Sequence, residues 1–134
     1  MKLLPLILGI GFFGGVGTLG RYGLTNLALW LTGPGHPWGT FAVNLLGCFL
    51  FGLLTGLFET ASLSPQWRAL LLTGLLGGFT TFSAFAHENF VLLEQRNWAA
   101  FGLHCIGQTV LGLLAVFLGL YMISHFTHLT EPVA

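Results

Sequence analysis

Few side chains of this 134-residue chain could do chemistry, and three of them lie within or beside long apolar stretches: Arg21, Asn44 and Glu88. An arginine keeps its charge even when buried, so one in an apolar helix marks a functional site or a paired structural one. If the apolar stretches cross a membrane alternately, all three residues fall in the same half of it. Two interpretations stay open: an Arg21–Glu88 salt bridge that locks helices together, or donors from Arg21 and Asn44 that face an anion.

Phe82 and Phe85 are spaced i, i+3, which places both rings on one face of a helix. Aromatic ring edges carry partial positive charge, so converging edges can hold an anion without binding it too tightly. Thr80, Thr81 and Ser83 supply hydroxyl donors nearby. A phenylalanine pair at helical spacing is also typical of a packed core, and the pattern alone does not decide between the two.

Gln108 and Thr109 lie near the middle of the last apolar stretch, with His104 one helical turn before Gln108. A single histidine there is more typical of a hydrogen-bonded contact between helices than of a metal ligand. The chain has no aspartate, no HExxH motif, no Ser-His-Asp set and no glycine loop of the kind that holds phosphates. We therefore do not expect an enzyme.

The composition places these residues in a membrane. Apolar residues make up 54% of the chain and charged residues 6%, where a soluble domain carries roughly 25%. Mean hydropathy is +0.86. These values exclude a soluble globular protein, and the lack of a basic patch excludes a nucleic-acid binder. We expect an integral membrane protein.

The apolar stretches predict one domain, 1–134, with four transmembrane helices at approximately 3–31, 38–58, 66–95 and 97–125. The spans must be helices because the alternation of a membrane barrel is absent. The third span carries Gly-Gly-Phe-Thr-Thr at 77–81, which weakens a helix. We expect an all-α fold with this third helix broken near its middle; a continuous helix that tolerates glycine for packing is the alternative.

The flanking charges barely favour one orientation. With Arg21 inside the membrane, one side carries Lys2 and Arg68 and the other carries Arg96. The numbers of lysines and arginines on the two sides set the orientation of a membrane protein. A split of two against one therefore allows insertion either way up. This suggests the hypothesis of an antiparallel, dual-topology homodimer.

Three stretches carry recognisable motifs: GGVGTLGRYG at 14–23, WGTFAVNLLGCFLFG at 38–52 and GLLGGFTTFSAF at 74–85. In this order and spacing they closely resemble the signatures of the Fluc (CrcB) fluoride channels. The resemblance extends over all four spans. It implies a channel in the cell inner (plasma) membrane that passively exports fluoride from the cytoplasm and so relieves fluoride toxicity, with two pores per antiparallel homodimer.

The resemblance also implies roles for single residues. Phe82 and Phe85 would form the phenylalanine box of the pore, Asn44 would meet the ion, and backbone carbonyls of Gly77 and Thr80 would bind a structural sodium ion at the dimer centre. Arg21 resembles the family's vestibule arginine, and Glu88 stands where the family usually keeps an acid. The full set of expected pore residues is Phe82, Phe85, Asn44, Ser83, Thr81, Gln108, Arg21, Glu88 and His104.

The chain departs from the family pattern on the fourth span. Family members usually place a tyrosine and then hydroxyl residues there, whereas this chain has His104, Gln108, Gly112 and Val116. The main alternative function is a small multidrug-type proton-coupled exporter, which needs a carboxylate in its first helix. The first span here has Arg21 and no acid, which counts against it. A non-transporting assembly subunit is a further alternative.

Overall fold

The computed structural model describes residues 3–34, 37–61 and 63–130, and its regular structure there is entirely helical. Four helical segments are long and apolar enough to cross a membrane. Lys2, used in the charge count above, lies outside the described residues. The predicted all-α fold with four spans and an interrupted third helix is confirmed.

The first two spans are continuous helices. Helix α1 (Leu3–Thr32) ends at Gly33, whose φ of 78° lies in the left-handed region that glycine adopts without strain. The Gly33 N–H donates to the Leu29 carbonyl over 2.9 Å, which closes the last turn. Helix α2 (Trp38–Thr60) follows and contains no charged residue before Glu59.

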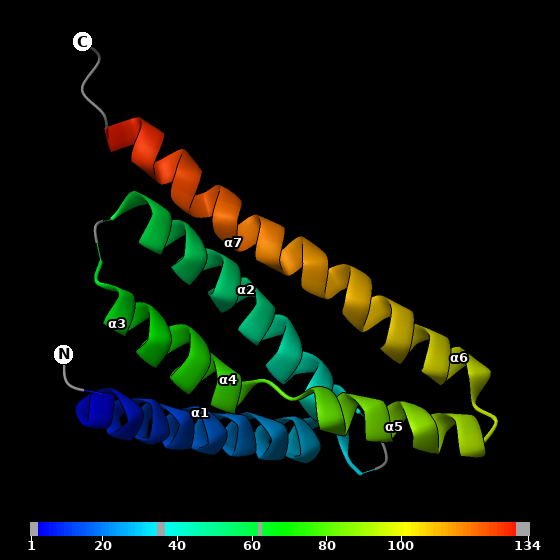
Figure 1. The fold of residues 1–134 in the computed structure, drawn as a ribbon. Helices are drawn as coiled ribbons and strands as arrows, with labels where there is room; N and C mark the ends of the chain where they lie inside the picture. Colours follow the sequence, from blue (N-terminus) through cyan, green and yellow to red (C-terminus); the bar gives the residue numbers. More distant parts are fainter. Residues whose placement is uncertain (1–2, 35–36, 62, 131–134) are drawn as a thin grey trace.

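The third span is broken at Thr80 and Thr81. Its first half is one continuous helix made of three segments: α3 (Pro65–Arg68), the π-helical segment η1 (Ala69–Leu76) and α4 (Gly77–Phe79). Both threonines then adopt extended backbone angles, and α5 (Phe82–Glu94) begins directly after them. Figure 1 shows the extended link between α4 and α5.

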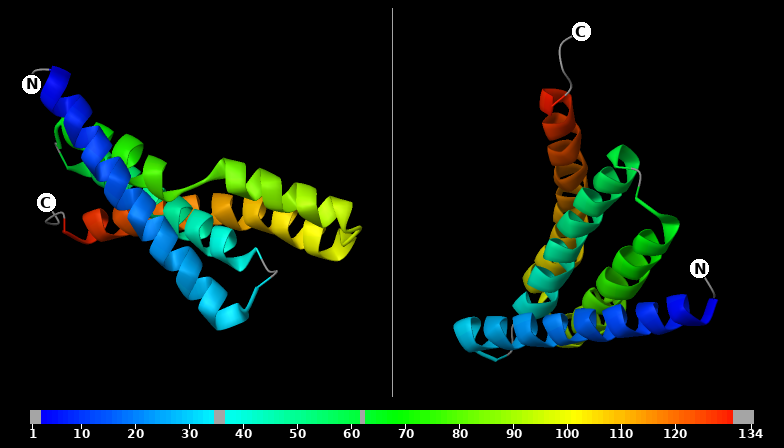
Figure 2. Two further views of the ribbon diagram at one scale, coloured as in Figure 1. Left: turned by 90° about the horizontal axis from the view of Figure 1, so that it is seen from below. Right: turned by 90° about the vertical axis from the view of Figure 1, so that its left-hand side faces the viewer.

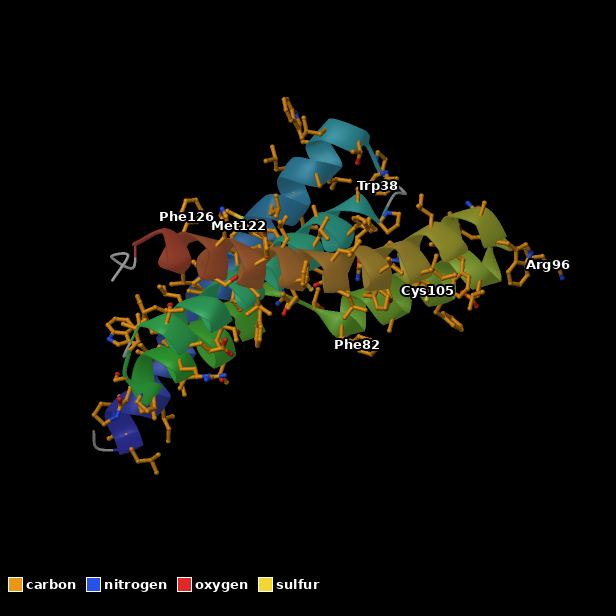
Figure 3. The ribbon with its side chains drawn as sticks, turned by 90° about the horizontal axis from the view of Figure 1, so that it is seen from above. Trp38, Phe82, Arg96, Cys105, Met122 and Phe126 are labelled. Atoms are coloured by element: carbon orange, nitrogen blue, oxygen red, sulfur yellow. The ribbon has the colours of Figure 1, made fainter. Side chains whose placement is uncertain are left out.

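The fourth span returns antiparallel to α5. After a tight turn at Arg96 (φ 54°), α6 (Trp98–Gly102), the π-helical segment η2 (Leu103–Gly107) and α7 (Gln108–Thr130) form one long helix. Asn97 caps it by accepting a hydrogen bond from the Ala100 N–H. Figure 3 shows Arg96 at this turn, far from Phe126 at the other end of the bundle.

The spans pack through glycine rather than through a large apolar core. Helix α2 runs along α7, and α1 lies across the first half of the third span (Figure 2). A Cβ on Gly17 would overlap the Leu75 carbonyl oxygen, and one on Gly78 would overlap the Gly14 carbonyl oxygen. Such close backbone approach is the usual packing of membrane helices. Among the described residues the buried aliphatic side chains are few: Val43, Leu72, Leu76 and Leu92.

Replacing Gly17 with alanine is expected to lower the free energy of unfolding by about 1–3 kcal/mol, the usual cost of overpacking. The physical cause is the overlap of the new Cβ with the Leu75 carbonyl oxygen. Gly15→Ala is the matched control, because nothing lies within 4 Å of a Cβ there. Thermal unfolding in detergent micelles measures the difference, and an equal loss in both variants would contradict this packing.

Candidate functional site

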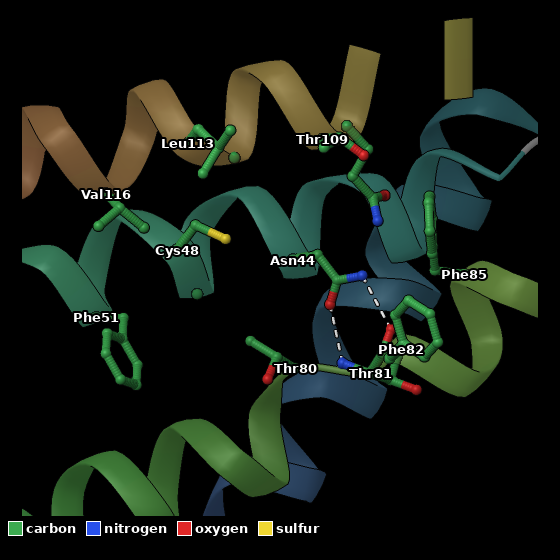
Figure 4. A pocket seen from close by; sticks show the side chains of 13 residues that line it. Asn44, Cys48, Phe51, Thr80, Thr81, Phe82, Phe85, Thr109, Leu113 and Val116 are labelled. Carbon is green, nitrogen blue, oxygen red and sulfur yellow. Dashed lines mark hydrogen bonds between the residues drawn. The ribbon is translucent and has the colours of Figure 1, made fainter. Parts of the chain in front are cut away.

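A groove opens where the broken third span faces α2 and α7 (Figure 4). It has a volume of about 410 Å³. The groove brings together five of the residues that were expected to form a pore, and they come from three different spans: Asn44, Thr81, Phe82, Phe85 and Gln108. The lining consists of Asn44, Gly47, Cys48, Phe51, Thr80, Thr81, Phe82, Phe85, Gln108, Thr109, Gly112, Leu113 and Val116. None of these side chains is charged.

Asn44 holds the broken backbone at one wall of the groove. Its Nδ2 donates to the Thr81 carbonyl over 3.0 Å, and its Oδ1 accepts from the Thr81 N–H at 2.8 Å. Figure 4 shows both bonds. Because a backbone N–H can only donate, these bonds also determine which amide atom is oxygen. Asn44 thus replaces the helical partners that Thr81 lacks.

Among the backbone carbonyls that the break releases from the helical pattern are those of Gly77 and Thr80. In an unbroken α-helix the Thr81 N–H would donate to the Gly77 carbonyl and the Ala84 N–H to the Thr80 carbonyl. Here Asn44 Oδ1 accepts from the Thr81 N–H, and Thr81 Oγ1 accepts from the Ala84 N–H at 3.2 Å. These are the two residues whose carbonyls the sequence resemblance assigns to a cation.

Phe82 and Phe85 lie side by side at the start of α5. Their ring centroids are 5.8 Å apart and their planes are tilted by 47°. Phe82 is 79% exposed, whereas Phe85 is half-buried. The neighbouring Ser83 does not line the groove, but its hydroxyl lies 3.2 Å from the hydroxyl of Thr81.

Helix α7 forms the opposite wall. Gln108 is 92% buried (8% exposed), and its Oε1 has no hydrogen-bond partner among the described residues. Thr109 also lines the groove, although its hydroxyl donates back to the Cys105 carbonyl over 2.8 Å. A Cβ at Gly112 would lie 3.4 Å from Cys48 Sγ, so the Cys48 thiol stands where the fourth span has no side chain.

Cys48 and Phe51 are groove residues that the sequence analysis did not identify. They follow Asn44 at i+4 and i+7, which places all three on one face of α2. This helical spacing is the signal in the sequence that could have identified Cys48 and Phe51. Figure 4 shows the Phe51 ring between α2 and the first half of the third span.

Glu88 and His104 lie outside the groove lining, behind Phe85. Glu88 Oε1 accepts a 2.6 Å hydrogen bond from the Thr40 hydroxyl, and Glu88 Oε2 lies 3.4 Å from His104 Nε2. His104 is 2% exposed, and its ring centroid is 5.4 Å from that of Phe85. The two residues therefore support the groove from behind.

Arg21 does not pair with Glu88, because Glu88 instead faces Thr40 and His104. Across 3–34, 37–61 and 63–130 no ion pair involves Arg21. Its side chain is half-buried and does not line the groove. The salt bridge considered from the sequence is thus absent from the described structure.

Comparison with known proteins supports the family resemblance seen in the sequence motifs. Residues 8–120 match the family described as CrcB-like protein, Camphor Resistance (CrcB). A "Fluoride-specific ion channel FluC" of Nitrosococcus oceani is 48% identical over 111 residues, which cover 82% of this chain and 89% of that protein. A protein of the same name from Nitratidesulfovibrio vulgaris (strain Miyazaki F) is 46% identical over 112 residues, covering 83% and 90%.

A third relative, the "Fluoride-specific ion channel FluC" of Chloroflexus aurantiacus, is 46% identical over 114 residues, which cover 84% of this chain and 90% of that protein. The matched region contains the second and third spans and most of the first and fourth. This is a family of channels and not of enzymes, as the sequence analysis expected. The chain belongs to the CrcB (FluC) family of fluoride channels.

Proposed function

We propose that this protein is a fluoride-selective channel of the inner (plasma) membrane that exports fluoride passively from the cytoplasm. Hydrogen fluoride crosses membranes as a neutral weak acid and ionises inside, so the trapped anion needs a route out. The observation that carries the proposal is the uncharged groove at the helix break, which joins the Phe82 and Phe85 rings to the Asn44 and Gln108 amides.

The groove suits a small, strongly hydrated anion. Fluoride must exchange its water for hydrogen-bond donors, and conduction requires that binding stays weak enough for release. Asn44 Nδ2 has two N–H groups, and only one is needed for the Thr81 carbonyl. The other N–H, the Gln108 amide and the ring edges can therefore act as neutral donors. Arg21, outside the groove, would attract anions to the entrance.

The fourth span provides a different set of contacts from the usual hydroxyl row. Gln108 contributes an amide, and the Cys48 thiol beside Gly112 contributes a weak S–H donor. Val116 contributes none. We expect fluoride to keep some of its water where it passes Gly112 and Val116, because few protein donors are available there.

A second copy would complete the pore. The groove is open along one side, and the Phe82 ring is 79% exposed next to it. In an antiparallel homodimer each copy would close the groove of the other, which gives two pores. Gly77 is exposed and Thr80 is half-buried, so their released carbonyls are accessible to a cation. One pair from each copy would supply four oxygens to a structural sodium ion, a hard cation that prefers such ligands.

No observation favours a small multidrug-type exporter. Its proton coupling would need a carboxylate in the first span, and Leu3–Thr32 contains none. Fluoride flux that is electrogenic and independent of a proton gradient would distinguish the channel from such an exchanger.

The proposal is tested by fluoride release from lipid vesicles that contain only this protein, measured with a fluoride electrode. Phe82→Ile is expected to slow the release at least about tenfold, because an aliphatic side chain has no positively polarised ring edge. Phe126→Ile is the matched control, since Phe126 lies near the far end of α7 (Figure 3). Inert wild-type protein would refute the channel, and undiminished flux through Phe82→Ile would move the pore elsewhere.

Exchange of sodium on both sides for a large organic cation is expected to abolish fluoride release slowly. The carbonyls of Gly77 and Thr80 would otherwise lie unpaired against one another at the dimer centre, where each unsatisfied group is costly. Return of sodium should restore the rate. Flux that persists after prolonged exchange would contradict a required ion.

The dual topology is tested by a C-terminal tag probed in intact cells with a reagent that does not cross the membrane. Labelling of about half the molecules is expected, because the flanking charges are nearly balanced. Gln95→Lys adds one positive charge to the exposed turn before α6 and should bias the population toward the orientation that keeps this turn inside. Complete labelling, or none, of the wild type would rule out mixed insertion.

A further inference from the structure

A buried polar cluster lies directly behind the aromatic pair. Thr40 of α2 donates to Glu88 of α5, and Glu88 faces His104 of η2, so three spans meet there. We propose that Glu88 and His104 share one proton and together act as a positioning pair for Phe85, so that the charge of the pair controls the rate of fluoride passage. This inference rests on the proposed function and adds a residue role to it.

The packing couples His104 mechanically to Phe85. The two rings lie 5.4 Å apart, tilted by only 32°, while the Phe41 ring packs at 6.2 Å from His104 as well. With 2% of its surface exposed, the imidazole has little space in which to move independently of these neighbours. A change in the distance between His104 and Glu88 is therefore transmitted to Phe85, and from it to Phe82 at 5.8 Å.

One nitrogen of His104 and one carboxylate oxygen of Glu88 face each other. His104 Nε2 and Glu88 Oε2 are 3.4 Å apart, and neither has a hydrogen bond to any other described residue. Two buried polar atoms in this arrangement are satisfied when one proton lies between them. When the His104 ring also carries a proton on Nδ1, the pair is neutral overall, as imidazolium and carboxylate or as imidazole and carboxylic acid.

Loss of one of these two protons leaves a neutral imidazole beside a carboxylate, and so one negative charge immediately behind Phe85. Few other charges are present to offset it. On α5 the nearby titratable group is the exposed His87, and the facing parts of α2 (38–52) and of the fourth span (98–121) contain no charged residue besides His104. In a medium of low polarity such a charge repels an approaching anion. Fluoride release is therefore expected to fall as the pH rises.

The experiment measures fluoride release from vesicles with the same pH on both sides, between about pH 5 and 8, where histidine changes charge. Leakage from protein-free vesicles is subtracted at each pH. Wild-type release is expected to fall about threefold or more across a single-proton transition. Glu88→Gln should keep the acid-side rate throughout, because the negative state can no longer form.

His104→Phe keeps a ring against Phe85 and Phe41 but removes the nitrogen, so the transition should move to a different pH as Glu88 titrates alone. His125→Phe is the matched control, because His125 is exposed and lies near the far end of α7, away from Glu88; it should keep the wild-type profile. If Glu88→Gln fails to assemble, His104→Phe decides.

Two results would overturn the inference: a flat profile in the wild type, or the wild-type profile in both the Glu88 and His104 variants. Fluoride release by the wild-type protein near pH 7 tests the proposed channel function separately. A protein that conducts fluoride with a flat profile would therefore refute the proton-sharing pair and leave the proposed function standing.

Discussion

A helix that breaks inside a membrane must find partners for its backbone groups, and here Asn44 provides them for Thr81. In hydrocarbon each unpaired N–H or C=O costs several kcal/mol, so an interrupted span survives only where protein satisfies it. The side-chain amide of Asn44 uses its oxygen and one of its two N–H groups to bind the N–H and the carbonyl of Thr81. The rest of the site depends on this pair of bonds.

The same two bonds explain the surrounding geometry. Because Asn44 holds Thr81 in extended backbone, α5 starts at Phe82, with Thr81 Oγ1 as its cap. The start of α5 determines where the rings of Phe82 and Phe85 emerge relative to α2. Release of the Gly77 and Thr80 carbonyls is a consequence of the same exchange of partners. The placement of the Phe82 and Phe85 rings and the release of the two carbonyls therefore have the same structural cause.

The features that the sequence predicted are those encoded by local chemistry. Four apolar stretches of membrane length, two glycines followed by two threonines at 77–81, and the i, i+3 rings each identify themselves within a few residues. The break could be predicted because Gly and Thr disfavour a helix, whatever they contact.

The missed features depend on tertiary packing. Arg21 and Glu88 share a half of the membrane by simple tracing, yet the partner of Glu88 was decided by Thr40 and His104, which arrive from other spans. The contact between Cys48 and Gly112 also depends on how α2 packs against α7. No local sequence pattern predicts that packing. The i+4 and i+7 spacing from Asn44 was readable, but only once Asn44 was known to face the groove.

The separation of charge from the groove is the last constraint. A cation in the lining would hold fluoride tightly, and an acid would repel it, whereas neutral amides and ring edges allow both entry and release. The chain keeps its polar but uncharged groups in the lining and places Glu88 and His104 one ring behind it, while Arg21 stands apart. In the proposed pore, charge would act on the anion through Phe85, at a distance, without forming a site in which the ion would be trapped.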